Sequence, residues 1–197
     1  MGAISPAPSL NKKLTNKIME KIIYPTIQGM KAENMEYEGI LYAGIMITKN
    51  GPKVIEFNCR FGDPESQAII PLLKTDLVEI FKRTNEKKLL EFNVELIKQN
   101  AITVVIASKG YPGNFKKNQI LPTLNNLKKT KDLTIYHSGT SINDKDELIN
   151  SGGRVFSITA IGKNIEICRN IAYSGVDLIN WKKGFYRTDI GIIVNSS

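Results

Sequence analysis

Apolar residues recur at two different spacings in the first half of the chain, and each spacing predicts a different kind of element. Between residues 14 and 32 isoleucine, leucine and methionine recur at helical intervals, which predicts two short helices or one bent helix because Pro25 breaks the pattern. Residues 41–48 and 53–61 have extended patterns and are joined by the turn signal Lys49-Asn50-Gly51-Pro52, which predicts a hairpin. The first of these strands is apolar on both faces, which favours a central place in a sheet.

The second half of the chain is richer in predicted strands. A β-branched run predicts a buried strand over residues 101–108, and further strands are expected over residues 133–137 and 154–161. Asn164 is expected to cap an amphipathic helix that follows the last of them. Asp76 is expected to cap a shorter helix in the first half. Residues 1–9, with two prolines among small residues, predict a loop.

The strand over residues 53–61 carries the most informative pattern in the chain. Side chains two residues apart share one face of a strand, so Glu56, Asn58 and Arg60 are expected on one face. Their carboxylate and amide oxygens are ligands that Mg²⁺ or Mn²⁺ prefers, and a guanidinium beside them suits phosphate. The opposite face is predicted to belong to the core, with Ile55, Phe57, Cys59 and Phe61.

The flanks of this strand refine the picture. A turn centred on Asn50-Gly51 would place Ile45 opposite Glu56 and Ala43 opposite Asn58, which leaves space and no competing salt bridge above the polar row. After the strand, Gly62 permits a sharp turn, and Asp63, Pro64 and Glu65 are typical of an N-cap, a first helical position and a first-turn acid.

Two interpretations of this region compete. One is a strand edge with a surface charge cluster followed by a well-capped helix, and for the Asp-Pro-Glu segment alone this structural interpretation is preferred. For Glu56, Asn58 and Arg60 a binding site is preferred, because three polar groups share one face of a strand that is otherwise apolar. A metal next to a phosphate-binding guanidinium is an arrangement that phosphoryl transfer requires.

The composition is typical of a globular protein without membrane-spanning segments. The 197 residues include 42% hydrophobic and 23% charged residues, which is typical of a globular protein of one large or two small domains. No apolar run is long enough for a membrane helix, and no signal-peptide pattern is visible at the start. The two cysteines indicate no disulfide framework, so a cytoplasmic location is expected.

The formal net charge of +8 favours anionic partners such as phosphorylated metabolites. The lysines are spread along the chain, often as pairs, without interleaved aromatic residues, so nucleic-acid binding is not expected. His137 is the only histidine, which excludes a two-histidine metal site and favours a structural role for this residue. The chain contains no GxxxxGK[ST] or GxGxxG phosphate loop.

The stretch from Val54 to Glu65, V-I-E-F-N-C-R-F-G-D-P-E, together with the segment that precedes it, closely resembles the phosphoribosylamine–glycine ligase (glycinamide ribonucleotide synthetase) family of the ATP-grasp superfamily. Further marks of the family follow in order along nearly the whole chain: Met1-Gly2-Ala3, Ser5-Pro6-Ala7-Pro8, Gly110-Tyr111-Pro112-Gly113, His137-Ser138-Gly139-Thr140, Gly152-Gly153-Arg154-Val155 and Arg187-Thr188-Asp189-Ile190-Gly191.

This resemblance implies an α+β fold: the C-terminal part of an ATP-grasp domain, an antiparallel sheet with helices, over residues 1–95, then a small β-rich domain over residues 96–197. It implies ligation of glycine to 5-phosphoribosylamine at the expense of ATP, through a glycyl phosphate, in purine biosynthesis. Glu56 and Asn58 match the Mg²⁺ or Mn²⁺ ligands of the family, and Arg60 matches a catalytic residue near the transferred phosphate or substrate. Many ATP-grasp enzymes carry a further carboxylate where this chain has Ala43.

The resemblance also implies that something is missing. Members of the family are about twice as long, and the likeness begins inside their glycine-rich loop, so the portion that clamps ATP is expected on a missing N-terminal half. That half is a candidate partner beside the three small-molecule substrates, and this chain alone is expected to be inactive or nearly so. The alternative is a non-catalytic fragment or module that binds a phosphorylated metabolite or a partner protein.

Overall fold

The computed structural model describes residues 1–124 and 131–192, and the chain divides into two compact units. Unit 1 comprises Met1–Pro6, Pro64–Leu72 and the chain from Ile97 onward, and unit 2 comprises Ala7–Asp63 and Leu73–Leu96. The mixture of helices and antiparallel strands agrees with the predicted α+β class. The division into residues 1–95 and 96–197 remains a proposal, because each compact unit draws on separate parts of the chain.

An antiparallel sheet organises unit 1. Its strands follow the order β1-β4-β8-β5, and β9 also pairs with β4. The elements of this unit are β1 (Gly2–Ser5), α3 (Glu65–Ile69), the 3₁₀ turn η2 (Ile70–Leu72), β4 (Asn100–Ser108), β5 (Leu133–His137), β6 (Thr140–Ile142), β7 (Leu148–Asn150), β8 (Arg154–Gly162), α5 (Ile165–Ile179) and β9 (Gly184–Phe185). The prediction of a loop at the start of the chain is wrong for Gly2–Ser5, which pair with β4.

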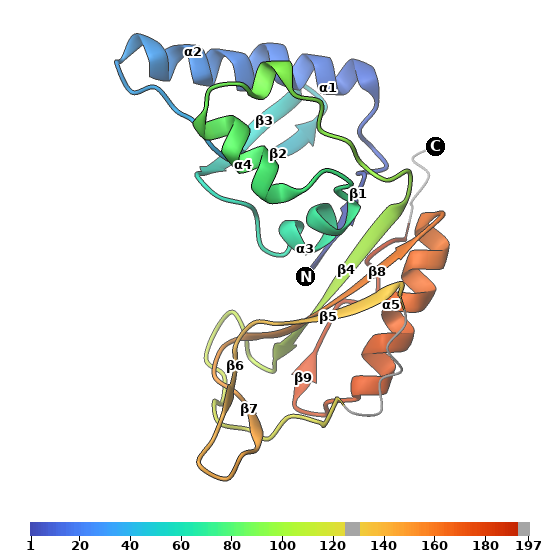
Figure 1. Cartoon of the computed structure of the whole chain (residues 1–197). Helices are drawn as coiled ribbons and strands as arrows, with labels where there is room; N and C mark the ends of the chain where they lie inside the picture. The colour runs from blue at the N-terminus through green and yellow to red at the C-terminus, as the bar shows by residue number, and fades with distance from the viewer. Residues whose placement is uncertain (125–130, 193–197) are drawn as a thin grey trace. The chain divides into compact units, whose positions relative to one another are not determined.

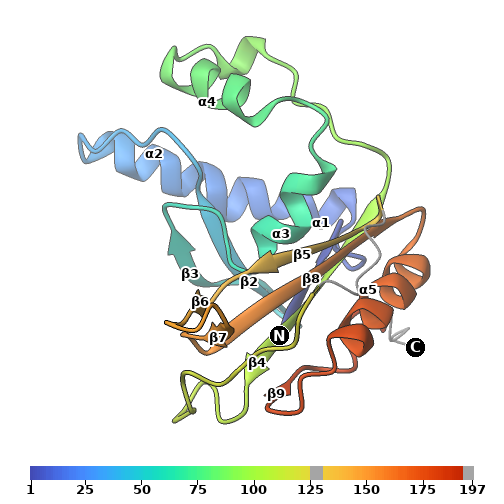
Figure 2. The same cartoon turned by 60° about the horizontal axis from the view of Figure 1, so that its bottom comes forward.

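The core of unit 1 lies between this sheet and α5 (Figure 1 and Figure 2). Strand β4 is buried along most of its length, as its β-branched run predicts, and β8 is buried in the same way. Asn164 caps α5 by accepting a hydrogen bond from the backbone N–H of Ile167 at 2.8 Å, which confirms the predicted helix start. Cys168, Ala172 and Val176 of the helix are buried against the strands, at the spacing of one helical face.

Unit 2 contains helices and a two-stranded sheet. Its elements are α1 (Lys12–Ile18), the π-helical turn η1 (Met19–Ile23), α2 (Tyr24–Ala32), β2 (Tyr42–Thr48), β3 (Gly51–Asn58), α4 (Leu77–Asn85) and the 3₁₀ turn η3 (Leu89–Glu91). Pro25 lies at the start of α2, directly after η1, so the helical run changes its winding before the proline. Asp76 caps α4 as predicted, accepting from Val78 N at 2.7 Å.

The predicted central position of β2 is wrong within the part of the chain that the structure describes, because β2 pairs there with β3 alone. An apolar pattern on both faces indicates that a strand is covered, but it does not say whether the covering layer lies in the same unit. In residues 1–124 and 131–192 no helix has the length and apolar character needed to cross a membrane.

Candidate functional site

The hairpin β2–β3 positions the candidate site, and a β-bulge sets its register. Gly44 pairs with Glu56, whereas the next pair is Ile45 with Val54, so that Ile55 is the extra residue on β3. The predicted register is therefore wrong: Gly44 lies opposite Glu56 in place of Ile45, and Tyr42 lies opposite Asn58 in place of Ala43.

The register that the bulge sets decides which side chains share each face of the hairpin. Directly opposed residues share a face, so the face of Glu56 and Asn58 includes Gly44 and Tyr42. A Cβ atom on Gly44 would lie 3.1 Å from Cγ of Glu56, and glycine at this position therefore leaves room for the acidic side chain. Ala43 pairs with Phe57 on the other face, so a carboxylate at position 43 would not lie beside Glu56.

The other face of β3 was predicted to be core, and within the described chain this prediction is wrong. The Ile55 side chain is 64% exposed and that of Phe57 is 41% exposed, and Cys59 is also exposed. Phe61 is half-buried. Alternation along a strand assigns side chains to faces, but burial of a face requires a second layer. The other elements of unit 2 cover only part of this hairpin.

Glu56 and Asn58 meet as predicted on one face. Nδ2 of Asn58 donates a hydrogen bond to Oε1 of Glu56 at 3.0 Å. Two neighbouring oxygen ligands of an octahedral Mg²⁺, each about 2.1 Å from the metal, are separated by about 3.0 Å. Rotation of the Asn58 amide by half a turn places its oxygen where its nitrogen lies, so the spacing of this pair fits one edge of such a coordination shell.

Arg60 lies beyond the end of β3, in a bend, so the predicted strand row of three residues is wrong for this residue. Its Nη1 donates to the backbone oxygen of Phe61 at 2.8 Å. No hydrogen bond or ion pair between described residues joins Arg60 to Glu56 or Asn58. The strand ends because its partner β2 begins at Tyr42, opposite Asn58, and offers no further residues to pair with.

The ion pairs between the side chains that the structure describes do not involve Glu56. Within residues 1–124 and 131–192 there is also no group of three His, Cys, Asp or Glu side chains that could hold a metal by itself. A metal on Glu56 and Asn58 would thus need further ligands from substrate, water or another part of the protein.

Tyr37 borders the same region and was not singled out from the sequence. Its hydroxyl donates to the backbone oxygen of Ile40 at 2.6 Å. Desolvation raises the pKa of the Tyr37 phenol, and the Cys59 thiol beside it adds to the increase. The phenol is therefore a neutral hydrogen-bonding group at ordinary pH.

The segment after the hairpin differs by one residue from the prediction. Helix α3 begins at Glu65, and Pro64, which makes no side-chain capping bond, takes the N-cap position that was predicted for Asp63. Glu65 is the first-turn acid as predicted. His137 in β5 has a structural environment, with Nδ1 3.0 Å from Oγ1 of Thr140 and its ring edge-on to Phe156.

Comparison with known protein families gives two matches, one in the first half of the chain and one in the second. Residues 1–66 match the phosphoribosylglycinamide synthetase ATP-grasp (A) domain, and residues 101–192 match the C domain of the same synthetase. The first match contains the whole hairpin with Glu56, Asn58 and Arg60, and the second contains most of unit 1.

Individual relatives agree with these matches. A phosphoribosylamine–glycine ligase of Caldanaerobacter subterraneus is 47% identical over 190 residues, which cover 96% of this chain and 45% of the relative. The trifunctional purine biosynthetic protein adenosine-3 of Gallus gallus is 45% identical over 192 residues, or 97% of this chain and 19% of the relative. The chain thus spans less than half the length of these relatives.

Solved structures show the same fold. The crystal structure of a Thermotoga maritima phosphoribosylamine–glycine ligase matches with a TM-score of 0.74 at 28% identity, over 96% of this chain and 46% of that one. The biotin carboxylase domain of Hydrogenobacter thermophilus 2-oxoglutarate carboxylase matches with a TM-score of 0.62 at 12% identity, over 94% of this chain and 40% of that one. The second likeness concerns the fold alone.

Proposed function

The chain belongs to the phosphoribosylglycinamide synthetase family, and from this premise we propose that it supplies part of the active site of an ATP-dependent ligase that joins glycine to 5-phosphoribosylamine. The observation that supports the proposal most directly is the Glu56–Asn58 pair, with its 3.0 Å spacing on an exposed face of β3. A cytoplasmic setting is part of the proposal and accords with the two free thiols.

The proposed reaction has two steps. A carboxylate oxygen of glycine takes the γ-phosphoryl group of ATP, which gives glycyl phosphate and ADP. The amine nitrogen of phosphoribosylamine then forms a bond to the carbonyl carbon and loses a proton, and inorganic phosphate leaves. Both steps move negative charge between oxygen atoms, so the main task of the protein is to position the reactants and to stabilise that charge.

Glu56 and Asn58 are proposed as ligands of Mg²⁺ or Mn²⁺. Their carboxylate and amide oxygens are hard donors, and Gly44 keeps the space beside Glu56 open. When bound, the divalent cation would neutralise charge on the transferred phosphoryl group. Nothing in the donor set distinguishes Mg²⁺ from Mn²⁺, since both accept oxygen ligands in octahedral geometry.

Arg60 is proposed to contact phosphate or substrate as a catalytic residue. Its bond to Phe61 uses one of the five N–H donors of the guanidinium, and the exposed group can present the others to phosphate oxygens. Replacement by lysine would keep the charge but lose this planar fork, so the Arg60→Lys variant is expected to lower kcat more than a loss of charge elsewhere on the surface.

The remainder of the ligase is the proposed partner, whether it lies on the same longer chain or on a separate one. In the described chain β2 and β3 pair only with each other, so each presents an unpaired edge, and Met46, Ile47 and Ile55 of this hairpin are exposed. Unpaired edges and exposed apolar side chains of this kind are normally covered by further strands or helices.

Mixing this chain with the ATP-binding portion of the Caldanaerobacter relative, produced separately, tests the proposal. ADP release over many turnovers that requires glycine and phosphoribosylamine together is the expected result, with little activity from either piece alone. A mixture that forms a complex and yet shows no activity would contradict the ligase assignment and favour the alternative of a non-catalytic binding module.

A further inference from the structure

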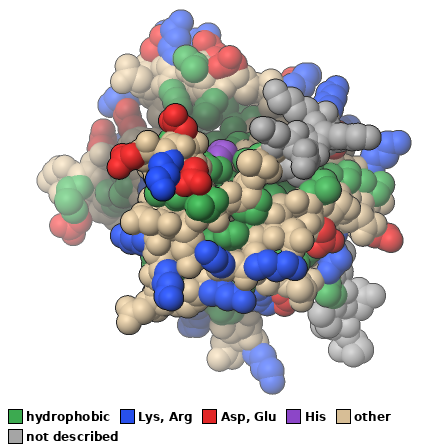
Figure 3. Space-filling view, turned by 90° about the horizontal axis from the view of Figure 1, so that it is seen from below, with side chains coloured by type: hydrophobic (Ala, Val, Ile, Leu, Met, Phe, Trp, Pro, Cys, Tyr) green, Lys and Arg blue, Asp and Glu red, His purple; other side chains and the backbone are tan. Residues whose placement is uncertain are grey.

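Unit 1 contains a second candidate site, well separated in sequence from the hairpin. A cavity of about 550 Å³ is lined by four lysines, Lys109, Lys116, Lys182 and Lys183, and by Asn114, Phe115 and Gln119. Its volume lies within the range of pockets that hold small molecules, about 300–1,000 Å³. On the face of the molecule that is viewed from below Figure 1, Lys and Arg side chains gather in a group (Figure 3).

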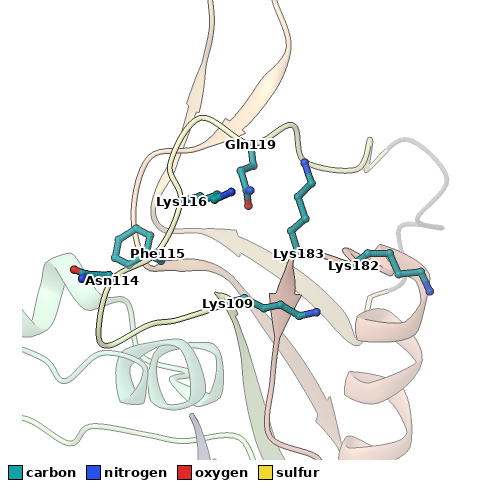
Figure 4. A pocket seen from close by; sticks show the side chains of 7 residues that line it. All are labelled: Lys109, Asn114, Phe115, Lys116, Gln119, Lys182 and Lys183. Atoms are coloured by element: carbon teal, nitrogen blue, oxygen red, sulfur yellow. The ribbon is translucent and has the colours of Figure 1, made fainter.

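The lysines differ in their directions. Figure 4 shows Lys116 and Gln119 pointing from their loop into the space that is bordered by Lys183, the residue before β9, with Lys109 crossing below them. Lys182 points away from this space (Figure 4). Three ammonium groups, those of Lys109, Lys116 and Lys183, therefore border one concave region.

Among the residues that the structure describes, these charges have no counterion within ion-pair distance. None of the ion pairs between described residues involves Lys109, Lys116 or Lys183, and the cavity lining contains no Asp or Glu. Lysines that serve only solubility are usually spread among acids, whereas like charges that face one cavity repel one another and gain from a bound anion.

A buried asparagine fixes the loop that carries two of the lining groups. Asn150 is completely buried, and its Nδ2 donates to the backbone oxygen of Lys116 at 2.7 Å and to Oγ of Ser108 at 2.9 Å. Its Oδ1 accepts from the backbone N–H of Gln119 at 2.7 Å. The oxygen and one hydrogen atom of this amide thus hold the loop, and the other hydrogen atom ties the amide to β4, so the backbone positions of Lys116 and Gln119 are set before any ligand arrives.

The other two lysines are held by main-chain pairing. The backbone N–H of Lys109 donates to the backbone oxygen of Lys183 at 3.0 Å, next to the pairing of Ser108 with Gly184 between β4 and β9. Gly110 then turns the chain with φ +101°, where a Cβ atom would lie 2.1 Å from the oxygen of Asn114. Only glycine allows the chain to return so closely over the cavity.

The charge of the cavity indicates the class of ligand. A phosphate monoester carries about −1.5 to −2 charges at pH 7, which would leave one of three lysines unneutralised. Two linked phosphate groups match three ammonium groups more closely and span a longer distance between them. Phe115 and Gln119, both half-buried, add an apolar wall and a hydrogen-bonding amide.

We propose that this cavity is an anion-binding site for a small molecule with two or more linked phosphate groups, contacted by Lys109, Lys116 and Lys183. The ligand is either inorganic pyrophosphate or a nucleoside diphosphate or triphosphate, and the phosphate chemistry is the same in each. The lining of this site shares no residue with the Glu56–Asn58 pair, and its occupancy can be measured on the chain as it is, without ligase activity.

Isothermal titration with pyrophosphate, ADP and adenosine in EDTA-containing buffer at 50 and 150 mM salt provides the test. Pyrophosphate and ADP are expected to bind with one-to-one stoichiometry, and adenosine is not. Replacement of Lys116 or Lys183 by glutamine is expected to weaken binding about tenfold or more for each charge-assisted contact that is lost. The Lys182→Gln variant is expected to show a much smaller change, because its side chain points away.

Two matched variants make the test specific. Lys145→Gln removes one exposed charge from the β6–β7 loop, and Glu33→Gln removes one exposed acid at the end of α2; both are expected to bind pyrophosphate like the unmodified chain. Tighter binding of ADP than of pyrophosphate would assign the site to nucleotides, with Phe115 against the base, and equal binding would assign it to the phosphate groups alone.

Three results would overturn the proposal. The first is no pyrophosphate binding at 10 mM ligand, which is about 100-fold above the dissociation constant near 0.1 mM that is expected for three such contacts. The second is an equal loss of pyrophosphate affinity in Lys116→Gln and Lys145→Gln, and the third is stronger binding of a short DNA oligonucleotide that does not depend on Lys116 and Lys183. The last two would identify a non-specific effect of the +8 net charge.

Discussion

The substitution Asn150→Ala is expected to destabilise unit 1 strongly, although Asn150 lies at the end of the three-residue strand β7. The side chain is 0% exposed and makes three hydrogen bonds, at 2.9 Å to Ser108, 2.7 Å to Lys116 and 2.7 Å to Gln119. Alanine removes all three bonds and leaves their partners to find water or remain unpaired.

The magnitude follows from the number of bonds and from their surroundings. Each hydrogen bond within a protein contributes about 1 kcal/mol net, and a buried partner left unsatisfied costs about 1–3 kcal/mol. Lys116 and Gln119 lie on a loop that borders a cavity, so water can replace some of the lost bonds. A loss of about 2–4 kcal/mol in the free energy of unfolding is therefore expected.

Urea unfolding followed by tryptophan fluorescence measures this loss of stability in unit 1. Trp181 is the only tryptophan of the chain, is 8% exposed and belongs to the core of unit 1. Asn143→Ala is the matched control, because Asn143 also makes three side-chain hydrogen bonds, each at 2.9 Å, but is only half-buried within the β6–β7 loop. Its replacement is expected to cost about 1 kcal/mol.

The comparison between the two asparagines decides whether the reasoning holds. If Asn150→Ala unfolds within about 0.5 kcal/mol of the unmodified chain, or no more easily than Asn143→Ala, then the buried network does not fix the cavity wall. The slope of unfolding free energy against urea should be unchanged in both variants, since neither alters the surface exposed on unfolding.

Three further predictions concern other parts of the chain. The hydrogen bond from Arg187, aided by the charge of its guanidinium, lowers the pKa of Asp189 to about 2, so an NMR titration should find the midpoint of this carboxylate near that pH. Any stability that the ionised carboxylate contributes should be present above pH 4 and lost between about pH 4 and 2. In the Arg187→Gln variant the midpoint of the Asp189 titration should rise toward the ordinary value for aspartate. A thiol reagent should modify exposed Cys59 within minutes, whereas Cys168, whose pKa is raised by burial, should react only on unfolding; equal rates would contradict the burial of Cys168. Gly110→Ala should cost about 1–3 kcal/mol in the same urea assay, and an unchanged midpoint would show that the turn can adopt another conformation.

The sequence predicted the elements whose signals are local. The β-branched run of β4, the cap of α5 at Asn164 and the cap of α4 at Asp76 all depend on residues within a few positions of one another. The sharing of one face by Glu56 and Asn58 is equally local, since it requires only the alternation of a strand.

The errors arise where distant residues decide the structure. Strand β1 forms because β4, about 100 residues later, offers a free edge, whereas its own sequence is typical of a loop. The bulge at Ile55 changes the register of the hairpin, although neither Ile55 nor its neighbours Val54 and Glu56 is a glycine or proline that would indicate a bulge at this point of β3. Burial of the apolar side of β3 depends on a covering layer, and alternation carries no information about such a layer.

The lysine-lined cavity could not be found from the sequence for the same reason. Lys116 and Lys183 appear there as members of separate lysine pairs, which are typical of a solvated surface. Pairing of β9 with β4 brings residue 183 to residue 109, and the buried amide of Asn150 adds the loop with residue 116. A basic cluster assembled by tertiary structure leaves no linear motif.

The central claim is that Glu56 and Asn58 form a metal-binding pair of a ligase, and the Glu56→Gln variant in the reconstituted two-piece enzyme tests it most directly. Glutamine keeps the size of the side chain but removes its charge, so kcat is expected to fall about 10²–10³-fold, with normal complex formation and with partial recovery at high Mn²⁺. Glu33→Gln, an exposed acid at the end of α2, should leave kcat unchanged. Equal activity of Glu56→Gln and Glu33→Gln would contradict the claim.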